Sequence, residues 1–131
     1  MSISKRHDPF PVATPYHGIY AHGVETAAGA RTLHISGQVG VSPSGQLPAD
    51  FEGQCRQALE NVEVVLNAAD MSKEDIVKMC FFLVRREDMD DLIKVRMDVL
   101  SGVRPAITAL YVAGLVSSDW LVEIDVVACA P

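Results

Sequence analysis

The chain lacks long hydrophobic runs, clusters of basic residues and any low-complexity segment. No stretch approaches the roughly 18 apolar residues of a membrane-spanning helix, and the first residues lack the apolar run of a signal peptide. These absences argue against a membrane protein and predict a cytoplasmic location. The formal net charge is −6, and no Lys/Arg cluster compensates for it. Nucleic acid is therefore a poor candidate partner, because its binding depends on cations that neutralise phosphates.

The chain also lacks the residue patterns that hold disulfides or metal ions. Its three cysteines, Cys55, Cys80 and Cys129, are odd in number, widely spaced and set in apolar patterns. They predict reduced core residues rather than disulfides. The histidines between residues 17 and 34 match no standard metal motif, and no cysteine joins them. We therefore expect no metal site.

What the chain does contain is the composition of one compact domain. Its 131 residues are 49% hydrophobic, which is enough for one core but not for two. We expect a single domain over residues 1–131. Within it, residues 1–15 should form an irregular segment, because prolines interrupt any sustained period there.

The stretch from Asp50 to Ala69 carries the clearest pattern in the sequence. Its apolar residues recur at steps of three and four, which places them on one stripe of an amphipathic helix. Pro48 prevents an earlier start, and Asp50 can accept hydrogen bonds from the free N–H groups of the first turn. An apolar stripe needs a covering layer, and candidate strands flank it on both sides in sequence. The helix is therefore expected to lie across a sheet.

The remaining segments predict a sheet and one more helix. Strands are expected at residues 19–25, 32–39, 76–84, 106–113 and 121–130, and a second helix at 88–100. A short turn separates the first two strands, which predicts a β-hairpin. The third strand is apolar almost throughout, as in a central strand covered on both faces. The order β-β-α-β-α-β-β predicts an α+β two-layer domain, with two helices on one face of a mixed sheet.

The other face of this sheet is expected to be only half polar. In residues 121–130 a fully apolar set alternates with a mixed set that contains Glu123 and Asp125. A half-apolar open face of this size is usually covered by another subunit. We therefore expect the chain to form an oligomer.

Five short motifs follow one another along the chain. They are Ile35-Ser36-Gly37-Gln38, Gln57-Ala58-Leu59-Glu60-Asn61-Val62, Asp75-Ile76-Val77-Lys78, Arg104-Pro105-Ala106 and Val122-Glu123-Ile124-Asp125. In their order and spacing they resemble the RidA/YjgF family of enamine/imine deaminases, long described as L-PSP-type endoribonucleases, over roughly residues 16–130. The resemblance implies a chorismate-mutase-like fold and a homotrimer whose sheets form an inner barrel. It also implies ligand pockets in the clefts between subunits, and neither a metal nor an organic cofactor.

The resemblance implies roles for four residues of this chain. Glu123 corresponds to the carboxylate that orients or activates the attacking water, and Tyr20 to a tyrosine of the pocket. Ser36 and Gly37 correspond to the pair whose backbone completes the pocket. A carboxylate in so apolar a strand costs several kcal/mol unless it is paired or faces a wet cleft. The structural alternatives are an ion pair across the interface for Glu123, sheet packing for Tyr20 and a β-bulge for Gly37.

Three positions depart from the family pattern. Ile107 stands where typical members have an arginine that grips the substrate carboxylate. Ile93 stands where an asparagine is common, and Arg96 where an aromatic residue is common. Arg104, beside a loop that is shorter than usual, or Arg96 could supply the missing clamp. The alternative for Arg104 is an ordinary exposed loop arginine.

We therefore expect an enzyme that hydrolyses a small enamine or imine to a carbonyl compound and ammonia. Because Ile107 makes its part of the pocket apolar, the expected substrate is larger or less acidic than a simple 2-imino acid. The alternative is a trimeric protein on the same scaffold that binds a small molecule, or modulates a partner, without chemistry. Stabilisation by a ligand without turnover would distinguish the two.

Overall fold

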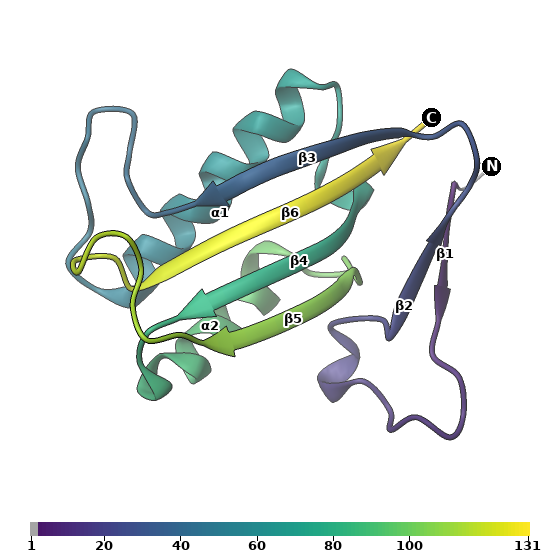
Figure 1. Cartoon of the computed structure of the whole chain (residues 1–131), viewed down its shortest axis with the longest axis horizontal. Helices are drawn as coiled ribbons and strands as arrows, with labels where there is room; N and C mark the ends of the chain where they lie inside the picture. The colour runs from purple at the N-terminus through teal and green to yellow at the C-terminus, as the bar shows by residue number, and fades with distance from the viewer. Residues whose placement is uncertain (1–2) are drawn as a thin grey trace.

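The computed structural model of the chain describes residues 3–131, apart from the side chain of His17. Its centre is a four-stranded sheet in the order β3-β6-β4-β5 (Figure 1). The strands are β3 (Arg31–Gln38), β4 (Ile76–Leu83), β5 (Ala106–Tyr111) and β6 (Val122–Ala130). β6 runs antiparallel to both of its neighbours, whereas β4 and β5 are parallel. The sheet is therefore mixed, as predicted.

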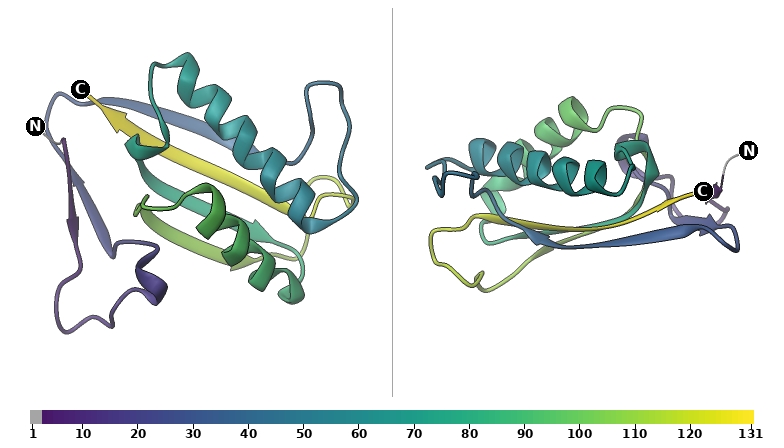
Figure 2. Two further views of the ribbon diagram at one scale, coloured as in Figure 1. Left: turned by 180° about the vertical axis from the view of Figure 1, so that it is seen from behind. Right: turned by 90° about the horizontal axis from the view of Figure 1, so that it is seen from above.

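Two helices cover one face of this sheet (Figure 2). They are α1 (Phe51–Ala68) and α2 (Met89–Val99). The predicted cap of α1 is present, since the Asp50 carboxylate accepts a hydrogen bond of 3.1 Å from the Gly53 N–H. The α+β two-layer architecture predicted from the sequence is confirmed. Among the described residues, neither helix has the length and apolar character needed to cross a membrane.

The strands divide their side chains between a buried face and an open face. On β6, Val122, Ile124 and Val126 are at most 1% exposed and belong to the core beneath the helices. Glu123 and Asp125 alternate with them and point to the other side. No helix in the described chain covers that second face (Figure 2).

The N-terminal part of the chain corrects two predictions. Residues 4–7 of the expected irregular segment form strand β1 (Ser4–His7), which pairs antiparallel with β2 (Gly23–Thr26). The predicted hairpin of residues 19–25 with 32–39 is also wrong, because β3 pairs with β6 instead. β1 and β2 form a separate two-stranded sheet beside the main one (Figure 1). A period of two in the sequence indicates an extended segment, but it does not specify the partner strand.

The segment before β2 reaches the edge of the main sheet. A short 3-10 helix at Tyr16–Gly18 precedes it, and Ala21 then forms an isolated parallel bridge with Ala106 at the start of β5. The Ala21 N–H donates to the carbonyl of Pro105 at 3.0 Å. These contacts hold residues 16–21 beside β5 and α2, where they form one wall of a pocket.

Candidate functional site

Glu123 and Gly37 face each other on the open side of the sheet. Glu123 is half-buried near the start of β6, opposite Phe82 of β4. Gly37 lies in a β-bulge of β3, where the register shifts between Ile35 and Gln38. A Cβ atom on Gly37 would lie 2.7 Å from Cδ of Glu123. Carbon atoms in contact are usually about 3.5–4.0 Å apart, so only glycine leaves room for this carboxylate.

The sequence interpretation of Gly37 therefore changes in one respect. The predicted close approach to the backbone is present, but the approaching group in this chain is the Glu123 side chain rather than a ligand. The alternative reading, a β-bulge, is also realised. Ser36 precedes Gly37 in the bulge and is exposed, and its carbonyl accepts a hydrogen bond of 3.0 Å from the Gln38 side chain. Glu123, Ser36 and Gly37 thus form one group, at the edge of the open face.

Tyr20 and Ile107 belong to a second group, around an apolar pocket of about 140 Å³. The pocket lies between α2, β5 and residues 16–20, and its walls expose only apolar atoms. Phe81 and Leu92, at most 4% exposed, lie at its base. Ile93 and Arg96 also line the pocket. All three positions that depart from the family pattern, Ile93, Arg96 and Ile107, therefore surround one cavity.

Arg104 does not line this apolar pocket. Its guanidinium pairs with the Asp8 carboxylate, and its Nη2 also donates to the Tyr20 carbonyl at 3.4 Å. The backbone carbonyl of Arg104 in turn accepts a hydrogen bond of 2.9 Å from Arg6 Nε. The His22 N–H donates to Asp8 at 2.7 Å, and this bond, with the pairing to Arg104, holds the pKa of the Asp8 carboxyl below its usual value. Arg104 thus fastens the N-terminal segment to the loop before β5.

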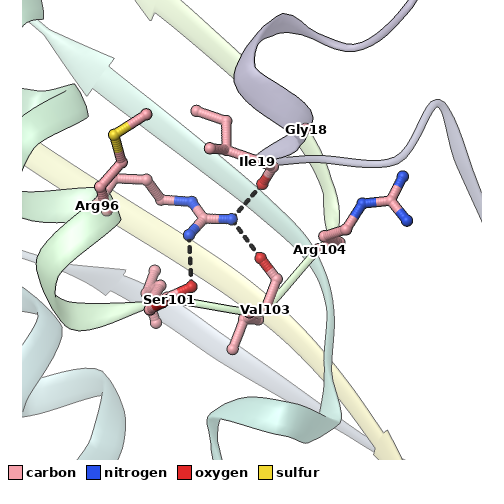
Figure 3. A pocket seen from close by; sticks show the side chains of 9 residues that line it. Gly18, Ile19, Arg96, Ser101, Val103 and Arg104 are labelled. Atoms are coloured by element: carbon pink, nitrogen blue, oxygen red, sulfur yellow. Dashed lines mark hydrogen bonds between the residues drawn. The ribbon is translucent and has the colours of Figure 1, made fainter.

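Arg104 instead lines an adjoining cavity of about 260 Å³, together with Arg96 (Figure 3). Arg96 is only 3% exposed, and its guanidinium donates to the backbone carbonyls of Ile19, Leu100 and Val103. Figure 3 shows Arg104 pointing away from Arg96. Burial lowers the pKa of Arg96.

Arg96 therefore acts as a structural connection. Its three acceptors belong to the N-terminal segment, the end of α2 and the loop before β5. The bond to Leu100 also places a positive charge at the carboxyl end of α2, where the helix dipole favours it. The sequence reasoning considered Arg96 only as a substitute clamp. The available signal was its position within the apolar helical spacing of residues 89–100, which required a polar partner inside the fold.

The two groups lie on opposite faces of the sheet. Glu123 pairs in register with Phe82, whereas the buried Phe81 pairs with Ala109, two residues from Ile107. Because successive side chains of a strand alternate in direction, Ile107 faces the helices and Glu123 faces away from them. A single copy of the chain therefore cannot bring the Glu123 carboxylate into the pocket that Tyr20 and Ile107 line.

The open face of the sheet also carries polar side chains on β4. Lys78 on β4 donates to the Thr108 hydroxyl at 2.9 Å. Burial, followed by the charge of Asp125, raises the pKa of the Cys80 thiol. Among the described residues, no group of three or more His, Cys, Asp or Glu side chains is placed to hold a metal ion.

Comparisons with known proteins point to one family. The model of the family described as endoribonuclease L-PSP matches residues 13–130. The 2-iminobutanoate/2-iminopropanoate deaminase of Mus musculus is 34% identical over 113 residues, which are 85% of this chain and 81% of that protein.

Two solved structures extend the likeness to three dimensions. The crystal structure of Escherichia coli TdcF with bound serine is 33% identical, covers 86% of this chain and 88% of its own, and has a TM-score of 0.72. The Rid family protein YyfB from Yersinia pestis, a protein of unknown function, is 26% identical with a TM-score of 0.86. That match covers 98% of this chain and 100% of YyfB, so it includes the N-terminal segment.

Proposed function

This chain belongs to the endoribonuclease L-PSP family, the RidA/YjgF proteins, and on that premise we propose that it hydrolyses a small enamine or imine to a carbonyl compound and ammonia. Relatives that carry the name 2-iminobutanoate/2-iminopropanoate deaminase support this reaction class. The TdcF structure with bound serine shows that a relative holds a small amino acid.

The observation that carries the proposal is the separation of the two groups in one chain. Glu123 and Gly37 lie on the open face, and the pocket of Tyr20 and Ile107 lies at the β5 edge under α2. Each group is incomplete alone, because no carboxylate is among the residues that line the apolar pocket and Glu123 lies on the opposite face of the sheet. A second copy that packs its open face against the β5 edge of the first would unite them. The proposed site therefore lies between subunits of a homotrimer.

The chemistry assigned to Glu123 is general base catalysis followed by general acid catalysis. Its carboxylate takes a proton from a water molecule while the water oxygen bonds to the iminium carbon, and the C=N π electrons move to nitrogen. The protonated Glu123 then donates its proton to the nitrogen of the resulting carbinolamine. Glu123, again a carboxylate, takes the hydroxyl proton as the C–N bond breaks, so that the carbonyl forms and ammonia leaves, and this proton then passes to ammonia or to solvent. An enamine enters this sequence after its carbon has been protonated to give the iminium ion.

The geometry around Glu123 suits this role. Among the described residues, no hydrogen bond or ion pair engages the Glu123 carboxylate, whereas its backbone is fixed in the centre of a sheet. Gly37 places the strand backbone directly against it and limits its rotamers. A carboxylate that is held in place but not neutralised is available to a water molecule.

One observation favours the non-catalytic alternative, a protein that binds a small molecule without turning it over. Ile107 offers no cation to a substrate carboxylate, and the guanidinium of Arg104 is engaged by Asp8. Under this alternative, a ligand raises the melting temperature but no imine disappears faster in the presence of the protein.

The experiment that tests the proposal is a coupled assay. An amino-acid oxidase generates imines from a panel of amino acids, and trapping by semicarbazide reports how fast each imine disappears. We expect this protein to accelerate the loss of at least one imine, and Glu123→Gln to abolish that acceleration while the far-UV circular dichroism stays unchanged. Asp125→Asn is the matched control, because Asp125 lies on the same face of the same strand. Equal activity of Glu123→Gln and the wild type would remove Glu123 from the mechanism.

A further inference from the structure

The apolar pocket has a volume that identifies the kind of group it can hold. It measures about 140 Å³, and its base is formed by the buried Phe81 and Leu92. Ile19, Ile93 and Ile107 stand around it as half-buried walls. An engineered cavity of about 150 Å³ with a similar lining of Leu, Ile and Phe stays dry and binds benzene. The pocket of this chain is thus large enough for a phenyl ring or a branched group of four carbons.

The pocket also has an entrance. Tyr16, which is 57% exposed, and the exposed Ala109 lie on its rim, while the side chains at its base are at most 4% exposed. A group can therefore enter from solvent and come to rest against the core. This arrangement differs from a packing defect, which would be closed on all sides.

The walls of the pocket expose only apolar atoms to the cavity. Arg96 is the one charged residue among those lining the pocket. Its two terminal nitrogens donate to three backbone carbonyls, and its Nε, which has no hydrogen-bond partner, is buried and not exposed to the cavity. A carboxylate or an amide placed there would lose its hydrogen bonds to water and gain none in return. The pocket therefore selects against polar groups as well as for apolar ones.

We propose that this pocket is a side-group subsite, and that the chain acts on imines whose side group is apolar and of the size of an isobutyl or benzyl group. Ile107 and Ile93 set this preference, because they shape the cavity and exclude charge from it. The catalytic part of the inference rests on the proposed function, whereas the binding part does not. The substrates would come from reactions that oxidise or deaminate amino acids with leucine-like or phenylalanine-like side chains.

The expected preference can be stated as a ratio. Burial of each methylene contributes about a fourfold gain in kcat/KM, so the three additional carbons of an isobutyl group over a methyl group give about 60-fold. The imine derived from leucine should therefore be hydrolysed about 60-fold more efficiently than the imine from alanine. The imine from asparagine has a side group of the same shape as that from leucine but polar, and it should resemble alanine or fall below it. Equal kcat/KM for the three imines would overturn the inference.

A binding experiment on the whole protein separates this inference from the reaction. The probes are 4-methylpentanamide and succinamide, two neutral and unreactive molecules of the same size, of which only the first has an apolar end. Methyl-detected NMR should show that 4-methylpentanamide shifts the signals of Ile107 and Ile93, while succinamide at the same concentration does not. Shifts from both probes, or from neither, would overturn the inference.

Two substitutions test whether the NMR shifts and the substrate preference arise at the apolar pocket. Ile107→Trp should fill the cavity and abolish both the NMR shifts and the preference for the leucine-derived imine. Val116→Trp is the control, because Val116 is 93% exposed and should leave both unchanged. Binding without hydrolysis would leave the subsite standing and remove the proposed function. Hydrolysis without a preference for apolar side groups would overturn the subsite and leave the proposed function standing.

Discussion

Replacement of Gly37 by alanine tests whether the position of the Glu123 carboxylate matters for activity. The new Cβ would lie 2.7 Å from Cδ of Glu123. Since carbon atoms in contact are about 3.5–4.0 Å apart, the carboxylate must move by about 1 Å. A misplacement of this size costs about 100-fold in the rate of a catalysed step. We therefore expect kcat to fall about 100-fold in Gly37→Ala.

The fold should tolerate this change. Gly37 is exposed, it lies on an edge strand, and its φ angle lies outside the left-handed region that favours glycine. The melting temperature should therefore change little. Gly114→Ala is the matched control, because a Cβ on Gly114 would meet nothing within 4 Å. The coupled imine assay and a thermal melt are run on both variants. A folded Gly37→Ala protein with wild-type kcat would refute the reasoning, because the carboxylate would then have no required position.

Three further predictions concern stability and reactivity. Arg96→Met leaves the buried carbonyl of Val103 without a donor, whereas the Leu100 carbonyl keeps its hydrogen bond from the Val103 N–H, so we expect a loss of about 1–3 kcal/mol in urea unfolding for this one carbonyl. A loss no larger than that of the exposed Arg31→Met would contradict the structural role of Arg96. The hydrogen bond from the His22 N–H, and then Arg104, lower the pKa of Asp8 from its usual value of 3.8. The ionised carboxylate therefore stabilises the fold fully above pH 3.8, and this stabilisation is lost as the pH falls through the lowered pKa. Asp8→Asn should accordingly melt below the wild type at pH 7, with a difference that disappears in acid; an unchanged difference would argue against the pair with Arg104. Burial raises the pKa of Cys55 to about 12, so mass spectrometry should find Cys55 unmodified after treatment of the native protein with a thiol reagent at pH 8, and rapid labelling would show that the core opens.

The sequence predicted those parts of the fold that depend on local patterns. The apolar stripe and the Asp50 cap of α1 are encoded within one stretch of chain, and the structure reproduces them within about two residues. The central strand β4 and the final strand β6 were recognised in the same way. The partner of β2 could not be predicted, because the choice between β1 and β3 depends on contacts far apart in sequence.

In the candidate site, too, some features could be predicted from the sequence and others depend on contacts between distant segments. The family resemblance selected Glu123 and Gly37, and the structure shows why they occur together, since the carboxylate occupies the space of the missing side chain. The convergence of Ile93, Arg96 and Ile107 on one pocket could not be read from their positions in the sequence. Arg96 follows a helical spacing, whereas its acceptors at Ile19 and Val103 lie on other elements. Such a role becomes visible only when the backbone carbonyls have been placed.

The central claim is that Glu123 of one copy acts on a substrate held in the pocket of another. Two variants can be co-expressed with different tags, purified through both so that every oligomer contains both chains, and assayed on the leucine-derived imine. They are Glu123→Gln, which lacks the carboxylate, and Ile107→Trp, whose filled pocket no longer takes the leucine-like side group. In a cyclic head-to-tail trimer of this kind, one site always combines an intact carboxylate with an intact pocket, so the coupled imine assay should recover about a third of wild-type activity. Mixed oligomers as inactive as the two parent variants would contradict a site shared between subunits.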